Sequence, residues 1–187
     1  SGSAAATRSA CGDVGASLAL VRIDDRLIHG QVTVAWGMWL EPDRIVLAND
    51  EVASTPWRRE LYADSDTLGA AVSVVRIDEL GAALRDGRWN GERLIVVVES
   101  PADLLRLLES GVEVPSANVG GMHFAPGKRE LLPYVYVSDD DVRAMKAVIA
   151  RGTGLRAQDV PQSGPVDLAP LIARPDPPVG KDPKPRA

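Results

Sequence analysis

The sequence predicts an α/β fold: a three-layer αβα sandwich in which helices cover both faces of a mainly parallel, open sheet of about six to seven strands. Two observations predict it. Short apolar runs alternate with helix start and stop signals between residues 18 and 173. Several runs, such as RLIVVVE at 93–99, are almost continuously apolar, as in strands covered on both faces. Helices between successive strands favour parallel pairing, with ligands bound at the carboxyl ends of the strands.

Seven segments have the short length and the apolar, β-branched character of strands. They are residues 18–23, 44–48, 71–77, 93–99, 116–120, 134–137 and 156–160. Capping residues mark three of the helices between them. The predicted N-caps are Thr55, Ser100 and Ser138, and the acids after Ser138 fit the first turn of a helix better than a calcium-binding run. Gly111 and Gly152 are predicted to end the second and third helices.

The two ends of the chain differ from its body. Residues 1–17 form a head rich in alanine, glycine and serine, which we expect to be disordered or a cloning remnant. Residues 174–187 form a proline-rich tail without large apolar side chains, and we expect it to be disordered. Residues 18–173 have no internal repeat and no convincing boundary, so we expect one domain there.

Composition excludes several classes of protein. The 45% hydrophobic and 25% charged residues are ordinary for a globular protein, and no apolar run reaches the ~20 residues of a membrane helix. The start has no apolar core like that of a signal peptide, so a cytoplasmic protein is expected. The net charge of −5 without a basic stripe argues against a nucleic-acid partner. Cys11 is the only cysteine, which excludes an intramolecular disulfide.

The segment RIDDRLIHGQV at 22–32 carries the chemistry. It follows the first predicted strand and precedes a helix that begins near Gly30 or Gln31, so it lies where backbone N–H groups bind anions. Arg22 and Arg26 suit phosphate oxygens, and the His29 imidazole is a nucleophile near neutral pH. This combination indicates phosphoryl transfer. The competing interpretation is a solvated or structural loop histidine with two surface arginines.

The two acids of this segment need another role, because a carboxylate facing a phosphate repels it. We expect Asp24 or Asp25 to orient Arg26 or to fix the tautomer of His29, while the other caps the loop. Gly30 and Gln31, at the helix start, are expected to support the phosphoryl site.

A second glycine-rich segment, NVGGMHFAPGK at 118–128, follows the fifth predicted strand. We expect Gly120, Gly121 and Met122 to lie beside the histidine loop, where glycine lets the backbone approach the phosphoryl group. We expect Asn49 and Asp50, after the second strand, to end at the same edge of the sheet, which makes them candidates for the rim of the site. The alternative is that all are turn residues remote from His29.

Other features carry less. The four tryptophans, Trp36, Trp39, Trp57 and Trp89, lie in helical contexts and are expected to pack in the core. The chain contains no phosphate-loop, dinucleotide-binding, nucleophile-elbow or zinc-protease motif. Two histidines are too few for a histidine-rich metal site, so no metal is expected.

RIDDRLIHGQV closely resembles the signature of the IIB component of the mannose/fructose/sorbose family of the bacterial phosphoenolpyruvate-dependent sugar phosphotransferase system (PTS). The resemblance continues through IVLANDEVASTPWRREL, SPADLLRLLESGV and SANVGGMHFAPGKRELLPYVYVSDDDV, and covers roughly residues 18–173. It implies a sandwich of helices around a mainly parallel sheet. It also implies a phosphohistidine, by motif position His29, modified on Nδ1. Arg26 matches the arginine that contacts the phosphoryl group, and Arg22 matches a second basic residue of the site.

The resemblance further implies partners. His29 would accept the phosphoryl group from phosphohistidine of a IIA component and pass it to a sugar delivered by the membrane IIC and IID components, without metal or organic cofactor. The protein would then be a sugar phosphotransferase acting at the inner face of the membrane. A regulatory relay that serves no transporter uses the same site, and a non-catalytic binding domain is a third reading. The sugar is not set by this chain, and a homodimer is left open.

Overall fold

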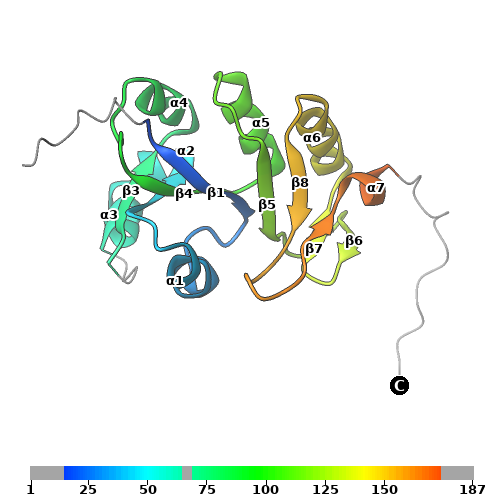
Figure 1. The fold of residues 1–187 in the computed structure, drawn as a ribbon. Helices are drawn as coiled ribbons and strands as arrows, with labels where there is room; N and C mark the ends of the chain where they lie inside the picture. Colours follow the sequence, from blue (N-terminus) through cyan, green and yellow to red (C-terminus); the bar gives the residue numbers. More distant parts are fainter. Residues whose placement is uncertain (1–14, 65–68, 174–187) are drawn as a thin grey trace, which may run out of the picture.

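The computed structural model describes residues 15–64 and 69–173, except the side chain of Gln31. The predicted tail and most of the predicted head lie outside these residues. Within them, seven strands form one sheet in the order β3-β2-β4-β1-β5-β8-β9 (Figure 1). They are β1 (Ser17–Asp24), β2 (Arg44–Ala48), β3 (Ala71–Val75), β4 (Arg93–Val98), β5 (Ser116–Gly121), β8 (Gly154–Ala157) and β9 (Val166–Asp167). All neighbours pair in parallel except β8 and β9, so the predicted mainly parallel sheet is confirmed.

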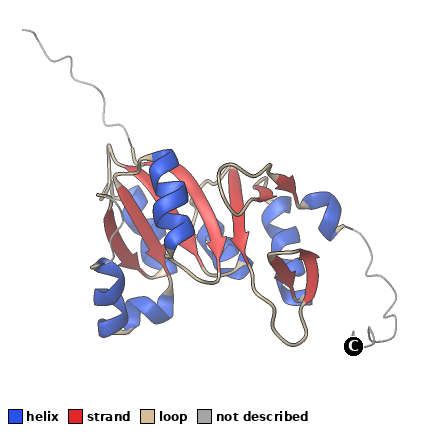
Figure 2. Cartoon of the chain, turned by 90° about the horizontal axis from the view of Figure 1, so that it is seen from below, coloured by secondary structure: helices blue, strands red, loops and turns tan. Residues whose placement is uncertain are grey.

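Helices lie on both sides of this sheet, as the sequence predicts (Figure 2). They are the π-helix η1 (Gln31–Trp36) and α1 (Gly37–Leu40), α2 (Asp50–Ser54), α3 (Pro56–Ala63), α4 (Ile77–Arg85), α5 (Pro101–Glu109), α6 (Asp139–Ala150) and α7 (Ala169–Ile172). None of the helices in the described ranges is both long and apolar enough to cross a bilayer.

Alternation along the strands divides the core into two halves. In β2, Val46 packs with α4 and α5 residues such as Leu80 and Leu104, while Ile45 and Leu47 pack on the other face, under η1 and α2. Successive strand side chains point to opposite faces, so a strand that is apolar at every position buries both. This explains why the middle strands read as continuous apolar runs.

The predicted helix caps are observed. Ser100 accepts a hydrogen bond from the backbone of Asp103, and Ser138 forms a reciprocal capping box with Asp141. Thr55 is the N-cap residue of α3, although its side chain makes no capping bond. The short helix α2 was not predicted, and its cap is Asn49, whose side chain accepts from Val52 N–H.

Three predictions about the elements are wrong. The segment 134–137 is not a strand of the main sheet, because β7 (Val135–Val137) pairs with β6 (Arg129–Leu132) in a separate antiparallel ribbon. An isolated parallel bridge between Val135 and Met122 ties this ribbon to the end of β5. The strand predicted at 156–160 lies earlier, as β8. Trp36 and Trp89 are buried as expected, but Trp39 and Trp57 are 64% and 66% exposed.

β1 and β5 separate toward their amino ends. They pair only at Arg22, Ile23 and Asp24, the carboxyl end of β1. A cleft of about 310 Å³ divides residues 18–21 of β1 from residues 116–118 of β5, and Figure 1 shows the two strands diverging there. β1 and β5 are therefore hydrogen-bonded to each other only at the end that lies beside the predicted phosphoryl site.

Candidate functional site

The loop between β1 and η1 presents His29 because its neighbours are anchored. Leu27 and Ile28 are buried in the core under η1, so Arg26 and His29, which flank them, face outward. Leu27 adopts a left-handed backbone conformation (φ 61°), and its N–H donates to the Asp24 carbonyl at 3.0 Å. A buried leucine in this conformation keeps the turn tight at some cost in backbone strain. The apolar pair thus fixes where the side chains of Arg26 and His29 lie.

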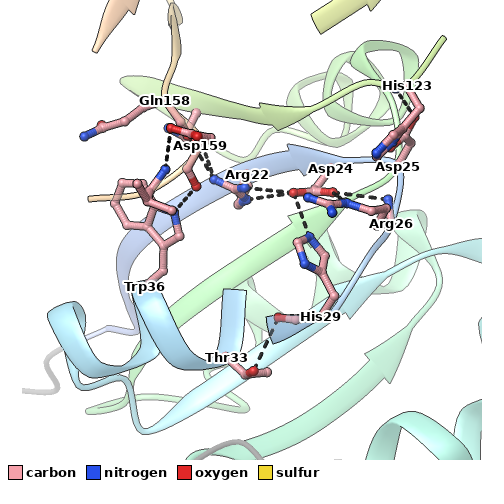
Figure 3. A network of polar contacts seen from close by, with 12 residues as sticks. Arg22, Asp24, Asp25, Arg26, His29, Thr33, Trp36, His123, Gln158 and Asp159 are labelled. Atoms are coloured by element: carbon pink, nitrogen blue, oxygen red, sulfur yellow. Dashed lines mark hydrogen bonds and ion pairs between the residues drawn. The ribbon is translucent and has the colours of Figure 1, made fainter. Parts of the chain in front are cut away.

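Asp24 is the centre of the site (Figure 3). Its Oδ2 lies 3.0 Å from Nε2 of His29, and its Oδ1 lies 3.8 Å from Nε of Arg26. The Asp24 side chain is fully buried, whereas those of His29 and Arg26 are 19% and 43% exposed. The expectation that one acid orients Arg26 or fixes the His29 tautomer is met by Asp24, which contacts both.

Arg22 lies behind Asp24 and not beside the phosphoryl position. Its side chain is fully buried, and its Nε and Nη2 donate to Asp24 Oδ2 at 3.1 and 2.8 Å. Its Nη1 donates to Asn118 Oδ1 at 2.7 Å and to the Gln158 carbonyl at 3.1 Å. The Trp36 ring lies 5.8 Å from the guanidinium carbon. The sequence predicts Arg22 as a second basic residue of the site; in this structure its side chain is fully buried and its described hydrogen bonds go to Asp24, Asn118 and Gln158.

Charge within this network favours an ionised Asp24. Burial by itself would raise the pKa of the Asp24 carboxyl, but the hydrogen bond from His29 and the Arg22 charge outweigh it, so this pKa lies below its ordinary value. Burial lowers the pKa of Arg22, and the Asp24 carboxylate opposes that effect. A carboxylate fixed in this way favours the His29 tautomer in which Nε2 carries the proton and donates a hydrogen bond to Asp24. In that tautomer the free lone pair is on Nδ1.

The glycine segment lies beside the histidine loop, as predicted. Asp24 is in register with Gly121 of β5, and Asp25 N–H donates to the Gly121 carbonyl at 3.1 Å. The reason for glycine differs from the expected one. A Cβ on Gly120 would lie 1.7 Å from the guanidinium carbon of Arg22, and a Cβ on Gly121 would lie 3.4 Å from Oδ1 of Asp24. Gly120 therefore makes room for the buried arginine.

The three other predicted support residues are Met122, Gly30 and Gln31. Met122 is 2% exposed and packs in the core. Gly30 begins the turn into η1, and a Cβ there would meet nothing within 4 Å. The side chain of Gln31 lies outside the described part of the chain. The sequence predicts free backbone N–H groups at this helix start. The N–H groups of Val32 and Thr33 instead both donate to the His29 carbonyl, so these two are not available to an anion.

Asn49 and Asp50 do not join the histidine loop. Asn49 caps α2 and donates to Glu99 at 2.6 Å. Asp50 pairs with Arg106 of α5 at 2.8 Å and accepts from Ile77 N–H at 3.0 Å. Their contacts tie helices α2, α4 and α5 together, so these two residues have a structural role.

Sequence reasoning missed several members of the site. Asp25 holds His123 and not His29, and Asn118, Gln158 and Trp36 surround Arg22. Asn118 is a buried polar residue in a strand predicted to be apolar, which is a signal that could have been used. The contacts of Arg22 with the Gln158 carbonyl and with Trp36 join residues distant in the sequence, so no local sequence pattern predicts them.

Comparisons with known proteins identify the family to which the chain belongs. The family model described as PTS system sorbose subfamily IIB component matches residues 18–178. The mannose-specific EIIAB component of Escherichia coli K12 is 35% identical over 159 residues, which are 85% of this chain and 49% of that protein. The chain therefore spans about half the length of these relatives. The sorbose-specific EIIB component of Klebsiella pneumoniae is 32% identical over 151 residues, 81% of this chain and 92% of that protein.

Solved structures have the same fold. The IIBSor domain of the sorbose permease from Klebsiella pneumoniae matches with a TM-score of 0.79 at 31% identity, covering 84% of this chain and 96% of that one. The N-acetylgalactosamine-specific IIB component 1 from Escherichia coli matches with a TM-score of 0.76 at 28% identity, covering 81% of this chain and 99% of that one.

Proposed function

Because the chain belongs to the sorbose subfamily of IIB components of the sugar phosphotransferase system, we propose that it is a phosphocarrier whose His29 accepts a phosphoryl group and passes it to a sugar. The observation that carries the choice of His29 is the 3.0 Å contact between its Nε2 and the buried Asp24 carboxylate. A histidine held at one ring nitrogen by a carboxylate has a fixed tautomer and orientation, which suits nucleophilic transfer.

In the first half-reaction the donor is phosphohistidine of a IIA component. Asp24 keeps the proton on Nε2 of His29, so Nδ1 attacks phosphorus. The nitrogen–phosphorus bond of the donor breaks as the new one forms, and its electron pair returns to the donor imidazole. No proton has to move in this step. The work of the protein is to position the ring and to neutralise charge.

Arg26 supplies that neutralisation. Its side chain is 43% exposed and is held near the site by Asp24, whose Oδ1 also accepts from the Arg26 backbone N–H at 3.2 Å. A planar guanidinium can bond two phosphoryl oxygens at once, which a lysine cannot. The buried Arg22 does not contact the phosphoryl group in this proposal. It holds the Asp24 carboxylate, which in turn orients His29.

In the second half-reaction a sugar hydroxyl oxygen attacks the phosphoryl group on His29. The bond between Nδ1 and phosphorus breaks, its electron pair returns to Nδ1, and the hydroxyl proton passes to a base of the acceptor complex or to water. The chain would work without metal or organic cofactor. The acceptor side would be the membrane components IIC and IID, which place the chain at the inner face of the membrane during transfer.

Phosphorylation of three proteins by a phosphorylated IIA donor tests the proposal: the wild type, His29→Ala and His123→Ala. His29 and His123 are the only histidines, so each variant leaves a single acceptor candidate. We expect acid-labile, alkali-stable label on the wild type and on His123→Ala, with the added mass on the peptide that contains His29. Label on His29→Ala would overturn the assignment.

A further inference from the structure

Asp25 and His123 form a polar pair that the mechanism above leaves unused. Asp25 Oδ1 lies 2.5 Å from Nδ1 of His123, and Asp25 Oδ2 accepts a 2.6 Å hydrogen bond from the His123 backbone N–H. Both carboxylate oxygens therefore hold one residue. The His123 side chain is nevertheless 55% exposed. The pair fixes the ring of a solvent-accessible histidine in one orientation, with Nε2 on the side of the ring away from Asp25.

The His123 ring is linked to His29 through Arg26 and Asp24. His123 and Arg26 line the same pocket, of about 380 Å³. Arg26 contacts Asp24, which contacts His29. Figure 3 shows Asp24, Arg26 and Asp25 between the two imidazoles. Two consecutive carboxylates thus hold two histidines, and the arginine that follows them faces the pocket that His123 lines.

We propose that His123, in its imidazolium form, is a second cationic contact of the phosphoryl group during transfer and acts beside Arg26. This inference rests on the proposed function of His29. The ligand chemistry is a phosphoryl group bound to nitrogen, whose three terminal oxygens carry the charge of the transition state. Arg26 bonds two of these oxygens, and the Nε2–H of His123 donates to the third. His123 itself forms no covalent bond and transfers no proton.

A pH dependence follows from this role, because histidine changes charge near neutral pH. The other titratable side chains that line the pocket or hold His123 are Asp25, Arg26, Tyr134, Tyr136 and Asp159. Burial raises the pKa of both tyrosines, so they stay neutral. A hydrogen bond from Ser163 lowers the pKa of the Asp159 carboxyl, so it stays charged. The two tyrosines and Asp159 therefore keep one charge state near neutral pH.

Single-turnover transfer from phosphorylated IIA to the wild type, His123→Gln and His123→Arg tests the inference, with each rate measured at about pH 6 and about pH 8.5. Dividing each variant rate by the wild-type rate cancels the titration of His29 and of the donor, because both are common to all three proteins. Glutamine removes the charge at every pH, and arginine keeps it at every pH. Circular dichroism confirms that each variant is folded.

We expect His123→Gln to transfer about tenfold more slowly than the wild type at the lower pH, and the difference to shrink toward none at the higher pH. His123→Arg should match the wild type at the lower pH and exceed it at the higher pH. A ratio that does not change with pH, or an arginine variant that behaves like glutamine, would overturn the inference. If the wild type takes up no label at all, the proposed function fails, and that outcome is distinct from a flat ratio.

Discussion

Two groups of aspartate and arginine follow parallel strands of one sheet, and they differ chiefly in burial. In the first, here called the histidine cluster (Arg22, Asp24, Arg26 and His29), the Arg22 and Asp24 side chains are fully buried. In the second, the Arg106 cluster (Asp50, Asp78, Asp103 and Arg106), the side chains of Arg106 and Asp50 are 39% and 32% exposed. Breaking a buried pair costs about 3–5 kcal/mol, whereas an exposed pair contributes about 0–1 kcal/mol.

The comparison teaches how to read charged residues after a strand. Asn49 and Asp50 follow β2 just as Asp24 and Asp25 end β1, so their positions in the sequence look alike. The contacts are different, because Asp50 ties helices together while Asp24 holds an imidazole. A carboxylate at the end of a strand is therefore a better candidate for a reactive site when it is buried and holds a side chain that can itself react, as Asp24 holds His29.

The largest loss of stability should come from Gly120→Ala, because the added methyl group disrupts the contact between Arg22 and Asp24 in the histidine cluster. The new methyl group would lie within 1.7 Å of the Arg22 guanidinium carbon and must displace it from Asp24. We expect a loss of about 3–5 kcal/mol in the free energy of unfolding, measured by urea denaturation. Gly30→Ala is the matched control, since its methyl group meets nothing within 4 Å. Equal losses in the two variants would contradict this account of Gly120.

The second prediction compares the two carboxylates directly. Asp24→Asn should slow phosphoryl transfer to His29 about a hundredfold, because an amide cannot fix the proton on Nε2 as a carboxylate does. Asp50→Asn should change the rate less than twofold. Single-turnover transfer from phosphorylated IIA measures both, below the melting temperature of each variant. A similar rate for the two variants would remove Asp24 from the mechanism.

The third prediction compares the two exposed arginines. Arg26→Lys should slow transfer about tenfold although the charge is kept, because the forked pair of hydrogen bonds is lost. Arg106→Lys should leave the rate unchanged, since Arg106 bonds Asp50 and Asp78 far from the histidine loop. Both variants should melt near the wild-type temperature. An unaltered rate in Arg26→Lys would show that charge alone suffices there.

The smallest effect concerns acid stability. Burial raises the pKa of the Asp50 carboxyl, but the bonds from Ile77 N–H and Arg106 outweigh it, so this pKa lies below its ordinary value. A carboxyl lowered in this way stabilises the fold fully above its unfolded pKa of about 3.9, and that stability is lost as the pH falls through the folded value. Asp50→Asn should therefore lose slightly less stability than the wild type on acidification from about pH 5 to about pH 3. Urea denaturation at both pH values measures the difference, and identical slopes would contradict it.

Much of the fold was accessible to sequence reasoning, because strands buried on both faces and capped helices leave local signals. The ribbon of β6 and β7 was misplaced, since three residues such as Val135–Val137 carry no information about their pairing partner. The place of His29 and Arg26 in a loop after a strand made them candidates, the family resemblance assigned their roles, and those roles stay predictions. Arg22 and Asp24 are two residues apart in a strand and so share a side, which could have indicated their pairing. The partners supplied by residues 158–159 could not be predicted, because they are backbone carbonyls distant in the sequence.

The short ladder between β1 and β5 couples two requirements that most proteins keep apart. The two strands share three register pairs, all beside the site, and the cleft separates the rest of their length. Arg22 crosses this junction from β1 to Asn118 of β5 and to the carbonyl of Gln158 after β8. The residues that hold Asp24, and through it His29, are therefore also those that hold the two halves of the sheet together. A substitution at Arg22, Asn118 or Gly120 should therefore change both the pairing of the two strands and the position of the Asp24 carboxylate.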